Sequence, residues 1–298
     1  MPNHNENGRG GVTLMQLLVC IAVIGVITSM LLPAVLQARA AARRIQCQSN
    51  LRQIGVALAS YEESHGQYPF EVLPTGDRVS GLVSIMERME LSNERRRLSK
   101  HPRFPNVLPA VPAYQCPAAR FATLSYSLSS GVRMATGEED NLTFDRPNGM
   151  SDKQRAIRAS GVTDGLSNTA FYSEALVARP RGSFIDKSDA IVDDPRRYKW
   201  GVTGPWNVST FRNQLAVRNV GSLRLLGRRT DPTTYSHIPM PNQLSTAWEV
   251  NSAASEHRNG VNVLFADGSS RLISDGIETR VWHAIGTRNG REVFSTDY

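Results

Sequence analysis

One apolar run near the N-terminus dominates the hydrophobic pattern of this chain. Residues 10–38 contain no Asp, Glu, Lys or Arg, and every helical face from Leu17 to Ile27 is apolar. A helix over the run would extend roughly 40 Å, against about 30 Å for the hydrocarbon core of a bilayer. The core helix of a soluble protein normally alternates apolar and polar positions. The pattern therefore predicts a transmembrane helix over residues 12–37.

The same helix is predicted to continue as an amphipathic segment over residues 38–66. Strong helix formers follow the apolar run, and neither Gly nor Pro interrupts them until Gly55. Apolar positions spaced by four and three residues then form one stripe: Cys47, Leu51, Ile54, Leu58 and Tyr61. Such a stripe needs a partner, and we expect a sheet from the rest of the chain to cover it. Gly66 and Pro69 predict that the helix ends near residues 64–66.

Strand and turn patterns in the rest of the chain predict an α+β fold. Alternation over residues 261–266, followed by Asp267-Gly268, predicts a β-hairpin with a type I′ turn that returns through residues 269–273. A final helix should follow, with Asp275 and Glu278 as its capping box. Helical spacing over residues 82–98 predicts another helix. The fold class expected is a long N-terminal helix packed on an antiparallel sheet, with loop-rich insertions.

Charge and composition predict neither a cofactor nor nucleic acid as a partner. The formal net charge is +7, but the Arg residues are scattered along the chain without interleaved aromatic residues. An acidic group (Glu138, Glu139, Asp140 and Asp145) could suggest calcium, yet it lacks the alternating ligands of an EF-hand loop. We interpret that group as a solvated loop.

Three cysteines bear on the compartment. Cys20 lies within the apolar run, which leaves Cys47 and Cys116 as a possible disulfide in an oxidising compartment. That bridge would close a loop of about 70 residues and could contribute roughly 4 kcal/mol by the chain-entropy model. No CxxC or Cys/His spacing typical of zinc is present, so no metal site is predicted.

A short polar leader precedes the apolar run and ends in Gly10-Gly11. A secretory signal is cut after its apolar region, whereas here the cut-like feature comes before it. The arrangement resembles type IV prepilins and type II secretion pseudopilins. The resemblance implies a leader over residues 1–11, removed after Gly11 by a prepilin peptidase, a mature methylation-type N-terminus at Val12, and a helix-kinking Pro33. Where that family usually carries Glu, this chain has Gln16, which cannot neutralise a charge.

Further motifs spread along the chain resemble a narrower family. The segment Leu31–Pro69, Cys116-Pro117 with Ser125–Ser127, and His257 followed after nine residues by Asp267-Gly268 resemble the planctomycete-type prepilin-like family DUF1559. A T-D-G-x-S-N-T segment of the family matches Asp164, Gly165, Ser167, Asn168 and Thr169. By this resemblance residues 67–298 form an extracytoplasmic α+β domain, within which residues 255–298 hold the H-x9-DG hairpin and the final helix.

These resemblances imply a structural protein rather than an enzyme. We expect a single-pass protein of the inner membrane with lipid, prepilin peptidase and other pilin-like subunits as partners, serving a type II secretion-like or pilus-like assembly. The alternative is a membrane-tethered binding module that does not polymerise, which Gln16 favours slightly. A count of positive charges (Arg39, Arg43, Arg44 and Arg52) would instead place the large domain in the cytoplasm.

Two residues of the family motifs invite a catalytic interpretation. Hydrolysis would need Ser167 beside a His and a carboxylate, and no G-x-S-x-G elbow is present. We expect the Asp164–Thr169 segment to be a structural corner that leads into a strand ending at Glu174. His257 is expected to bind the backbone or a carboxylate at a sheet edge. A metal site shared with Asp267 is disfavoured, because a strand of about ten residues would separate the two.

Overall fold

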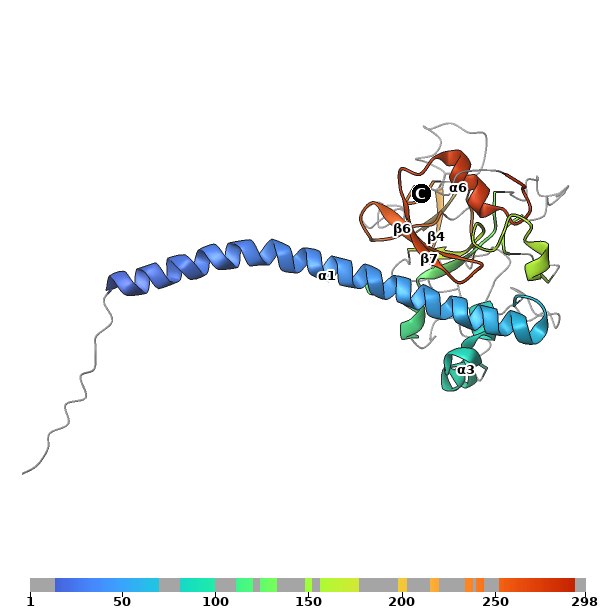
Figure 1. Ribbon diagram of the computed structural model, residues 1–298, viewed down its shortest axis with the longest axis horizontal. Helices are drawn as coiled ribbons and strands as arrows, with labels where there is room; N and C mark the ends of the chain where they lie inside the picture. The colour runs from blue at the N-terminus through green and yellow to red at the C-terminus, as the bar shows by residue number, and fades with distance from the viewer. Residues whose placement is uncertain are drawn as a thin grey trace, which may run out of the picture. The chain divides into compact units, whose positions relative to one another are not determined.

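The structure is a computed structural model in which α1 (Leu14–His65) is the longest element described. It describes residues 14–69, 81–99, 111–119, 124–132, 148–151, 156–176, 198–202, 215–219, 234–237, 240–243 and 252–292. The chain divides into two compact units, Met1–Ala42 and Arg43–Tyr298, and α1 begins in the first and ends in the second (Figure 1). The predicted leader and the cleavage residues Gly11 and Val12 lie outside the described residues.

Helix α1 is one continuous helix of 52 residues, which runs through Pro33 without interruption. Among the described residues it is the one helix long and apolar enough to cross a membrane. Its large apolar side chains from Leu14 to Leu36 are exposed. The helix ends where the sequence predicted, because Gly66 has a φ of +67° and its N–H donates to the carbonyl of Glu62 at 2.7 Å.

The second half of α1 packs on a five-stranded sheet of order β5-β1-β2-β6-β7. The strands are β1 (Tyr126–Ser129), β2 (Ala170–Glu174), β5 (Thr234–Tyr235), β6 (Gly260–Phe265) and β7 (Ser270–Ser274). Four of them pair antiparallel, which confirms the predicted α+β class, while β5 pairs parallel to β1. A separate antiparallel pair is formed by β3 (Tyr198–Val202) and β4 (Leu215–Asn219).

The predicted helix over residues 82–98 is wrong, because the chain forms three short helical segments there instead. These are α2 (Gly81–Ser84), a 3₁₀ turn at Met86–Met89 and α3 (Ser92–Ser99). Glu90 follows the 3₁₀ turn in the left-handed region, with a φ of 61°, which no continuous α-helix can contain. Two further 3₁₀ turns lie at Pro112–Tyr114 and Ala159–Gly161.

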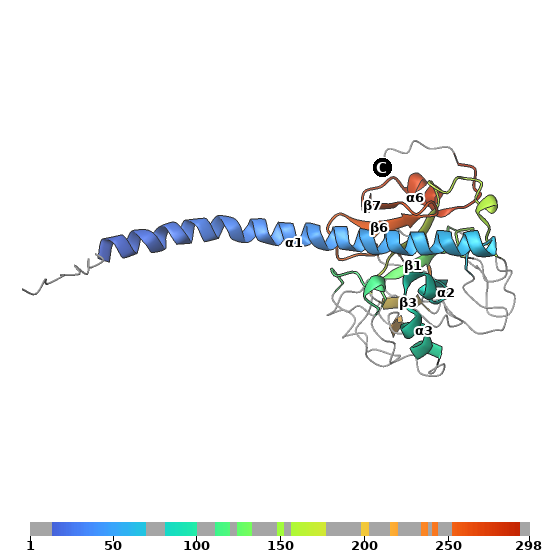
Figure 2. The same cartoon turned by 60° about the horizontal axis from the view of Figure 1, so that its bottom comes forward.

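The sheet has a hydrophobic core on each face, and β6 contributes to both. Leu264 joins the cluster that contains the predicted stripe of α1, of which Cys47, Leu51, Ile54 and Leu58 are buried. The alternate residues Val261, Val263 and Phe265 point to the other face, where they pack with Trp282 and Ile285 of α6 (Thr279–Gly286). Figure 2 shows β6 between α1 and α6.

The β6–β7 turn differs from the predicted type I′ turn. Of its residues, only Gly268 has a positive φ, +84°. The Gly268 N–H donates to Phe265 O at 3.0 Å and the Phe265 N–H donates to Ser269 O at 2.8 Å, which makes a three-residue loop with a bulge at the glycine. Asp267 instead accepts the Ser269 N–H at 2.8 Å through its side chain, which fixes the turn without a left-handed residue at that position.

The predicted capping box of the last helix is also wrong. Glu278 is the N-cap residue of α6, and in the part of the chain that the structure describes it makes no side-chain cap bond. Asp275 accepts a hydrogen bond from Asn242 Nδ2 at 2.6 Å, so its carboxylate is used outside the helix.

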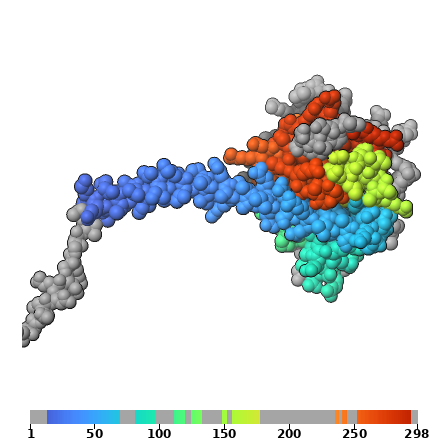
Figure 3. All heavy atoms as spheres, in the orientation of Figure 1, coloured from blue at the N-terminus to red at the C-terminus, as the bar shows by residue number. Residues whose placement is uncertain are grey.

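The β6–β7 turn lies directly against α1. A Cβ atom added to Gly55 would lie 2.9 Å from the Cα of Gly268 and 3.0 Å from the side chain of Leu264. Figure 3 shows the C-terminal segment in orange and red against the second half of α1. Two glycines therefore let the helix and the turn approach with their backbones in contact, which explains a structural need for Gly268 beyond its φ.

We expect Gly55→Ala to destabilise the chain although alanine is the better helix former. The added methyl group meets backbone rather than a flexible side chain, and such overpacking costs about 1–3 kcal/mol, against a helix-propensity gain of about 1 kcal/mol. Thermal unfolding of the detergent-solubilised chain measures the effect. Val56→Ala is the matched control, because Val56 is 70% exposed on the same helix. Equal melting temperatures for both variants would contradict the close contact.

A buried histidine joins β5 to α6. His237 donates from Nδ1 to Trp282 O at 2.8 Å and accepts from the Tyr235 hydroxyl at Nε2 at 3.0 Å. Burial lowers the pKa of His237 to about 3, although the Trp282 carbonyl opposes the shift. The ring is therefore neutral in the folded chain at pH values where the unfolded chain, with an ordinary histidine pKa of about 6.5, takes up a proton.

The free energy of unfolding should fall as the pH falls from about 6.5 towards 3. In this window the unfolded state binds up to one proton more than the folded state at His237, so stability decreases by up to about 1.4 kcal/mol per pH unit. Denaturant unfolding between pH 6.5 and 5 measures the slope, since ordinary carboxylates contribute little there. His237→Asn keeps a donor towards Trp282 O and should flatten the slope. An identical slope in both chains would refute the assignment.

Candidate functional site

A disulfide joins the buried half of α1 to the segment before β1. Cys47 and Cys116 are bonded with an S–S distance of 1.98 Å across a sequence separation of 69 residues, and both are buried. The neighbouring Asn50 donates to Gln115 O at 2.9 Å, so a hydrogen bond parallels the covalent link. The two cysteines that the sequence left as a possible pair are thus bonded in the structure.

A buried carboxylate lies beside this disulfide at the end of β2. Glu174 is 2% exposed, and Asn262 of the adjacent strand β6 holds both of its oxygens. The Asn262 N–H donates to Oε2 and Asn262 Nδ2 donates to Oε1, each at 2.9 Å. Antiparallel pairing of β2 with β6 brings the two residues together. A buried carboxylate without such donors would be costly, which explains why a polar Asn stands within an otherwise apolar strand.

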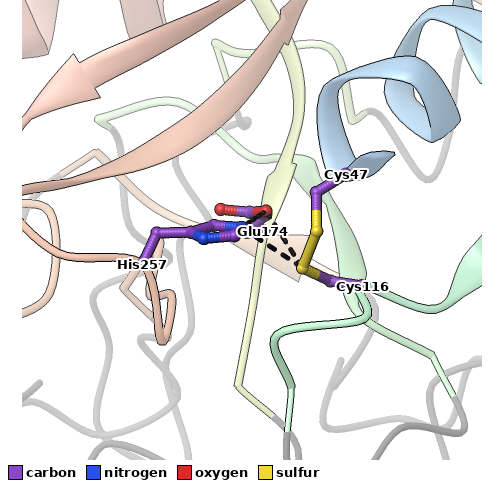
Figure 4. A group of neighbouring side chains, drawn as sticks. All are labelled: Cys47, Cys116, Glu174 and His257. Carbon is purple, nitrogen blue, oxygen red and sulfur yellow. Dashed lines mark hydrogen bonds and ion pairs between the residues drawn. A yellow bond between two sulfur atoms is a disulfide. The ribbon is translucent and has the colours of Figure 1, made fainter. Parts of the chain in front are cut away.

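His257 completes the group from the loop before β6. Its Nε2 lies 3.2 Å from Glu174 Oε1, and the ring is nearly as buried as the carboxylate. A hydrogen bond from the His257 N–H to Ser255 Oγ at 3.1 Å shapes the loop that presents the ring. Of the two partners expected for His257, a backbone group or a carboxylate at a sheet edge, the structure shows a carboxylate, but Glu174 lies at the end of the central strand β2 rather than at an edge of the sheet. We name Cys47, Cys116, Glu174 and His257 the four-residue cluster (Figure 4).

The donor atoms of the four-residue cluster converge on one point. Cys116 Sγ lies 3.4 Å from both Glu174 Oε1 and His257 Nε2, and all four ligand-type atoms lie within 4.8 Å of one another. As a disulfide sulfur, Cys116 Sγ carries no proton, so its approach to the carboxylate is a contact rather than a hydrogen bond. His257 Nε2 is then the donor to Glu174. Burial and, secondarily, the negative charge of Glu174 raise the pKa of the nearby Tyr126 phenol.

The Asp164–Thr169 motif forms a corner rather than part of this cluster. Asp164 accepts hydrogen bonds from the N–H groups of Gly290 and Arg291, at 2.7 and 2.8 Å, and so ties down the segment after α6. Asn168 Nδ2 donates to Asp164 O and Thr169 Oγ1 donates to Gly165 O, each at 3.1 Å. Gly165, at a φ of +94°, supplies the turn.

The structure separates the residues of the catalytic interpretation. Ser167 is exposed and precedes the first residue of β2, whereas His257 contacts Glu174 at the other end of that strand. Five strand residues at about 3.3 Å each place them roughly 15 Å apart or more. Asp267 and Gly268 likewise lie at the far end of β6 from His257.

Other residues singled out by the sequence lie away from the cluster or outside the described residues. Gln16 and Pro33 are in the first half of α1. The acidic residues considered for calcium, residues 138–140 and 145, lie outside the described residues. The sequence interpretation missed Glu174 and Asn262 as site residues. The signal available in the sequence was a polar residue within an apolar strand pattern. In the structure every residue of β2 and β6 is buried, so a polar residue there needs a partner.

Comparisons with known proteins agree with the motifs. A family model described as "Protein of unknown function (DUF1559)" matches residues 36–280. The match covers the second half of α1, the whole described sheet and the four-residue cluster. No curated protein and no solved structure matches the chain. Since the family model spans most of its length, the chain belongs to the DUF1559 family.

Proposed function

We propose that the chain is a prepilin- or pseudopilin-like subunit, cut after Gly11 and held in the inner membrane by the first half of α1. Family membership and the apolar helix already indicate a membrane-anchored protein. The observation that carries the finer proposal is the position of Gly10-Gly11 directly before an uninterrupted apolar run. A cut at this place removes the polar leader and keeps the helix, which then continues into the folded domain as in pilins.

The cysteine chemistry supports an extracytoplasmic domain. Disulfides persist in oxidising compartments and are rare in the cytosol, and Cys47–Cys116 closes a long loop within the folded domain. The positive charges that follow the apolar run oppose this orientation. We give the disulfide more weight than the charge count. The prepilin resemblance also implies a domain outside the cytoplasm, and we expect the leader, rather than the charges, to set the orientation of such a chain.

A structural role fits the arrangement of the polar residues better than a catalytic one. Asp164 anchors the C-terminal segment, and Ser167 lies far from His257 along β2. The four-residue cluster is closed off from solvent, since the side chains of Glu174 and His257 are both nearly fully buried. A substrate would have no access to these groups without a movement of the surrounding chain.

Processing at Gly11 provides the direct test. Mass spectrometry of the N-terminus in the native membrane should find a mature chain that begins at Val12. Gly11→Leu should leave the leader attached, because the leader of the prepilins that this chain resembles is removed after a Gly, while Gly10→Ala should still be processed. Recovery of Met1 in the unaltered chain would reduce the protein to an ordinary single-span anchor.

Gln16 favours a second candidate, a tethered binding module that does not polymerise. A glutamine at the fifth mature position cannot neutralise the α-amino group of a neighbouring subunit. If the chain otherwise packs like a pilin subunit, Gln16→Glu should increase crosslinked multimers in membranes. Gln37→Glu on the same helix is the control and should not. Unchanged monomers in Gln16→Glu would favour the tethered module over the pilin-like subunit.

A further inference from the structure

The four-residue cluster has the composition of a metal site as well as of a disulfide site. It combines two cysteine sulfurs, one imidazole nitrogen and one carboxylate oxygen. Two thiolates with a histidine favour zinc and related divalent ions, whereas calcium and magnesium prefer oxygen ligands alone. We propose that, once its cysteines are reduced, the four-residue cluster binds one zinc-class divalent cation. This inference does not depend on the prepilin-like function.

The distances already present fit a tetrahedral site. With metal–sulfur bonds of about 2.3 Å and metal–nitrogen and metal–oxygen bonds of about 2.0–2.2 Å, tetrahedral ligands lie about 3.6 Å apart for sulfur with nitrogen or oxygen, and about 3.4 Å apart for nitrogen with oxygen. Cys116 Sγ lies 3.4 Å from His257 Nε2 and 3.4 Å from Glu174 Oε1, and the last two atoms are 3.2 Å apart. Three ligands therefore stand close to the required triangle.

Only Cys47 has to move. In a tetrahedral site its sulfur would lie about 3.8 Å from Cys116 Sγ, so breaking the disulfide and separating the sulfurs by about 2 Å suffices. Cys47 lies on α1 and Cys116 on a separate segment, so no single rigid element fixes the sulfurs together. Its sulfur is already within 4.8 Å of the other three ligand atoms.

Surrounding hydrogen bonds hold the ligands in place. Asn262 donates to both oxygens of Glu174, and Ser125 Oγ accepts from the Cys116 N–H at 2.9 Å. Such contacts to the ligands themselves commonly orient a metal site and contribute to its affinity. Burial of all four ligands makes this a closed structural site rather than one with an open position for substrate.

Reduction of the disulfide requires one co-reactant, here a dithiol. A dithiol reductant supplies two electrons and two protons, the Cys47–Cys116 bond breaks, and the reductant becomes a disulfide. Metal binding then forms two metal–sulfur bonds and releases both thiol protons. His257 coordinates through Nε2, so the proton that this nitrogen donates to Glu174 has to leave it. In a neutral ring that proton moves to Nδ1, and in a charged ring it is released as a third proton while Nδ1 keeps its own. Glu174 then coordinates as the carboxylate. Because the disulfide and the metal use the same sulfur atoms, oxidation and metal binding exclude each other.

The test uses full-length chain carrying Cys20→Ser, so that only the two cluster thiols remain, in detergent micelles. After reduction with a phosphine, which does not compete strongly for the metal, Co²⁺ should bind one per chain and give sulfur charge-transfer and tetrahedral visible bands. The oxidised chain should give neither. His257→Ala and Glu174→Ala should each weaken binding about tenfold or more. Exposed His65→Ala and Glu63→Ala are the matched controls and should not.

X-ray absorption of the zinc-loaded, reduced chain needs no ligand substitution and covers the case in which a variant does not fold. It should find two sulfur and two nitrogen or oxygen neighbours, with the scattering of one imidazole. A reduced chain with two free thiols that takes up no metal would overturn the proposal. Equal affinity in His257→Ala, Glu174→Ala and their controls, or a zinc shell without imidazole, would overturn it as well.

Discussion

The fold depends on close packing of the second half of α1 against one face of the sheet. The backbone sets this packing at the β6–β7 turn, where Gly55 meets Gly268, and the Cys47–Cys116 bond ties the helix to the segment before β1. Between them the buried stripe of α1 covers one face of the sheet. A helix whose apolar side chains lie in lipid gains no hydrophobic free energy from packing against a protein domain, so the first half of α1 does not drive folding of the domain. Its continuation does, because that segment has one apolar face.

The second constraint is the cost of polar groups in the core of the domain. Glu174 is acceptable at 2% exposure because Asn262 and His257 donate to its oxygens. These contacts connect β2, β6 and the loop before β6 around the disulfide. The H-x9-DG motif has a structural explanation at each of its ends. His257 joins this buried network, and Gly268 allows the turn at the far end of β6 to lie on α1.

Sequence patterns identified the elements more reliably than their details. Local periodicity and turn residues predicted four features: the helix end at Gly66, the stripe of α1, the strand ending at Glu174 and the β6–β7 hairpin. The predicted type I′ turn is wrong, because Asp267 uses its side chain to fix a type I turn with a following glycine bulge. The prediction of one helix over residues 82–98 is wrong, because helical spacing does not reveal a residue with left-handed backbone such as Glu90.

The sequence by itself determined the apolar helix, the α+β class and the family, since each depends on local pattern or on motifs in order along the chain. Only the tertiary structure decided that Cys47, Cys116, Glu174 and His257 meet at one point. Their positions span more than two-thirds of the chain, so no spacing motif connects them. Pairing of β2 with β6, together with docking of α1, brings them together, and such long-range pairing leaves no local trace in the sequence.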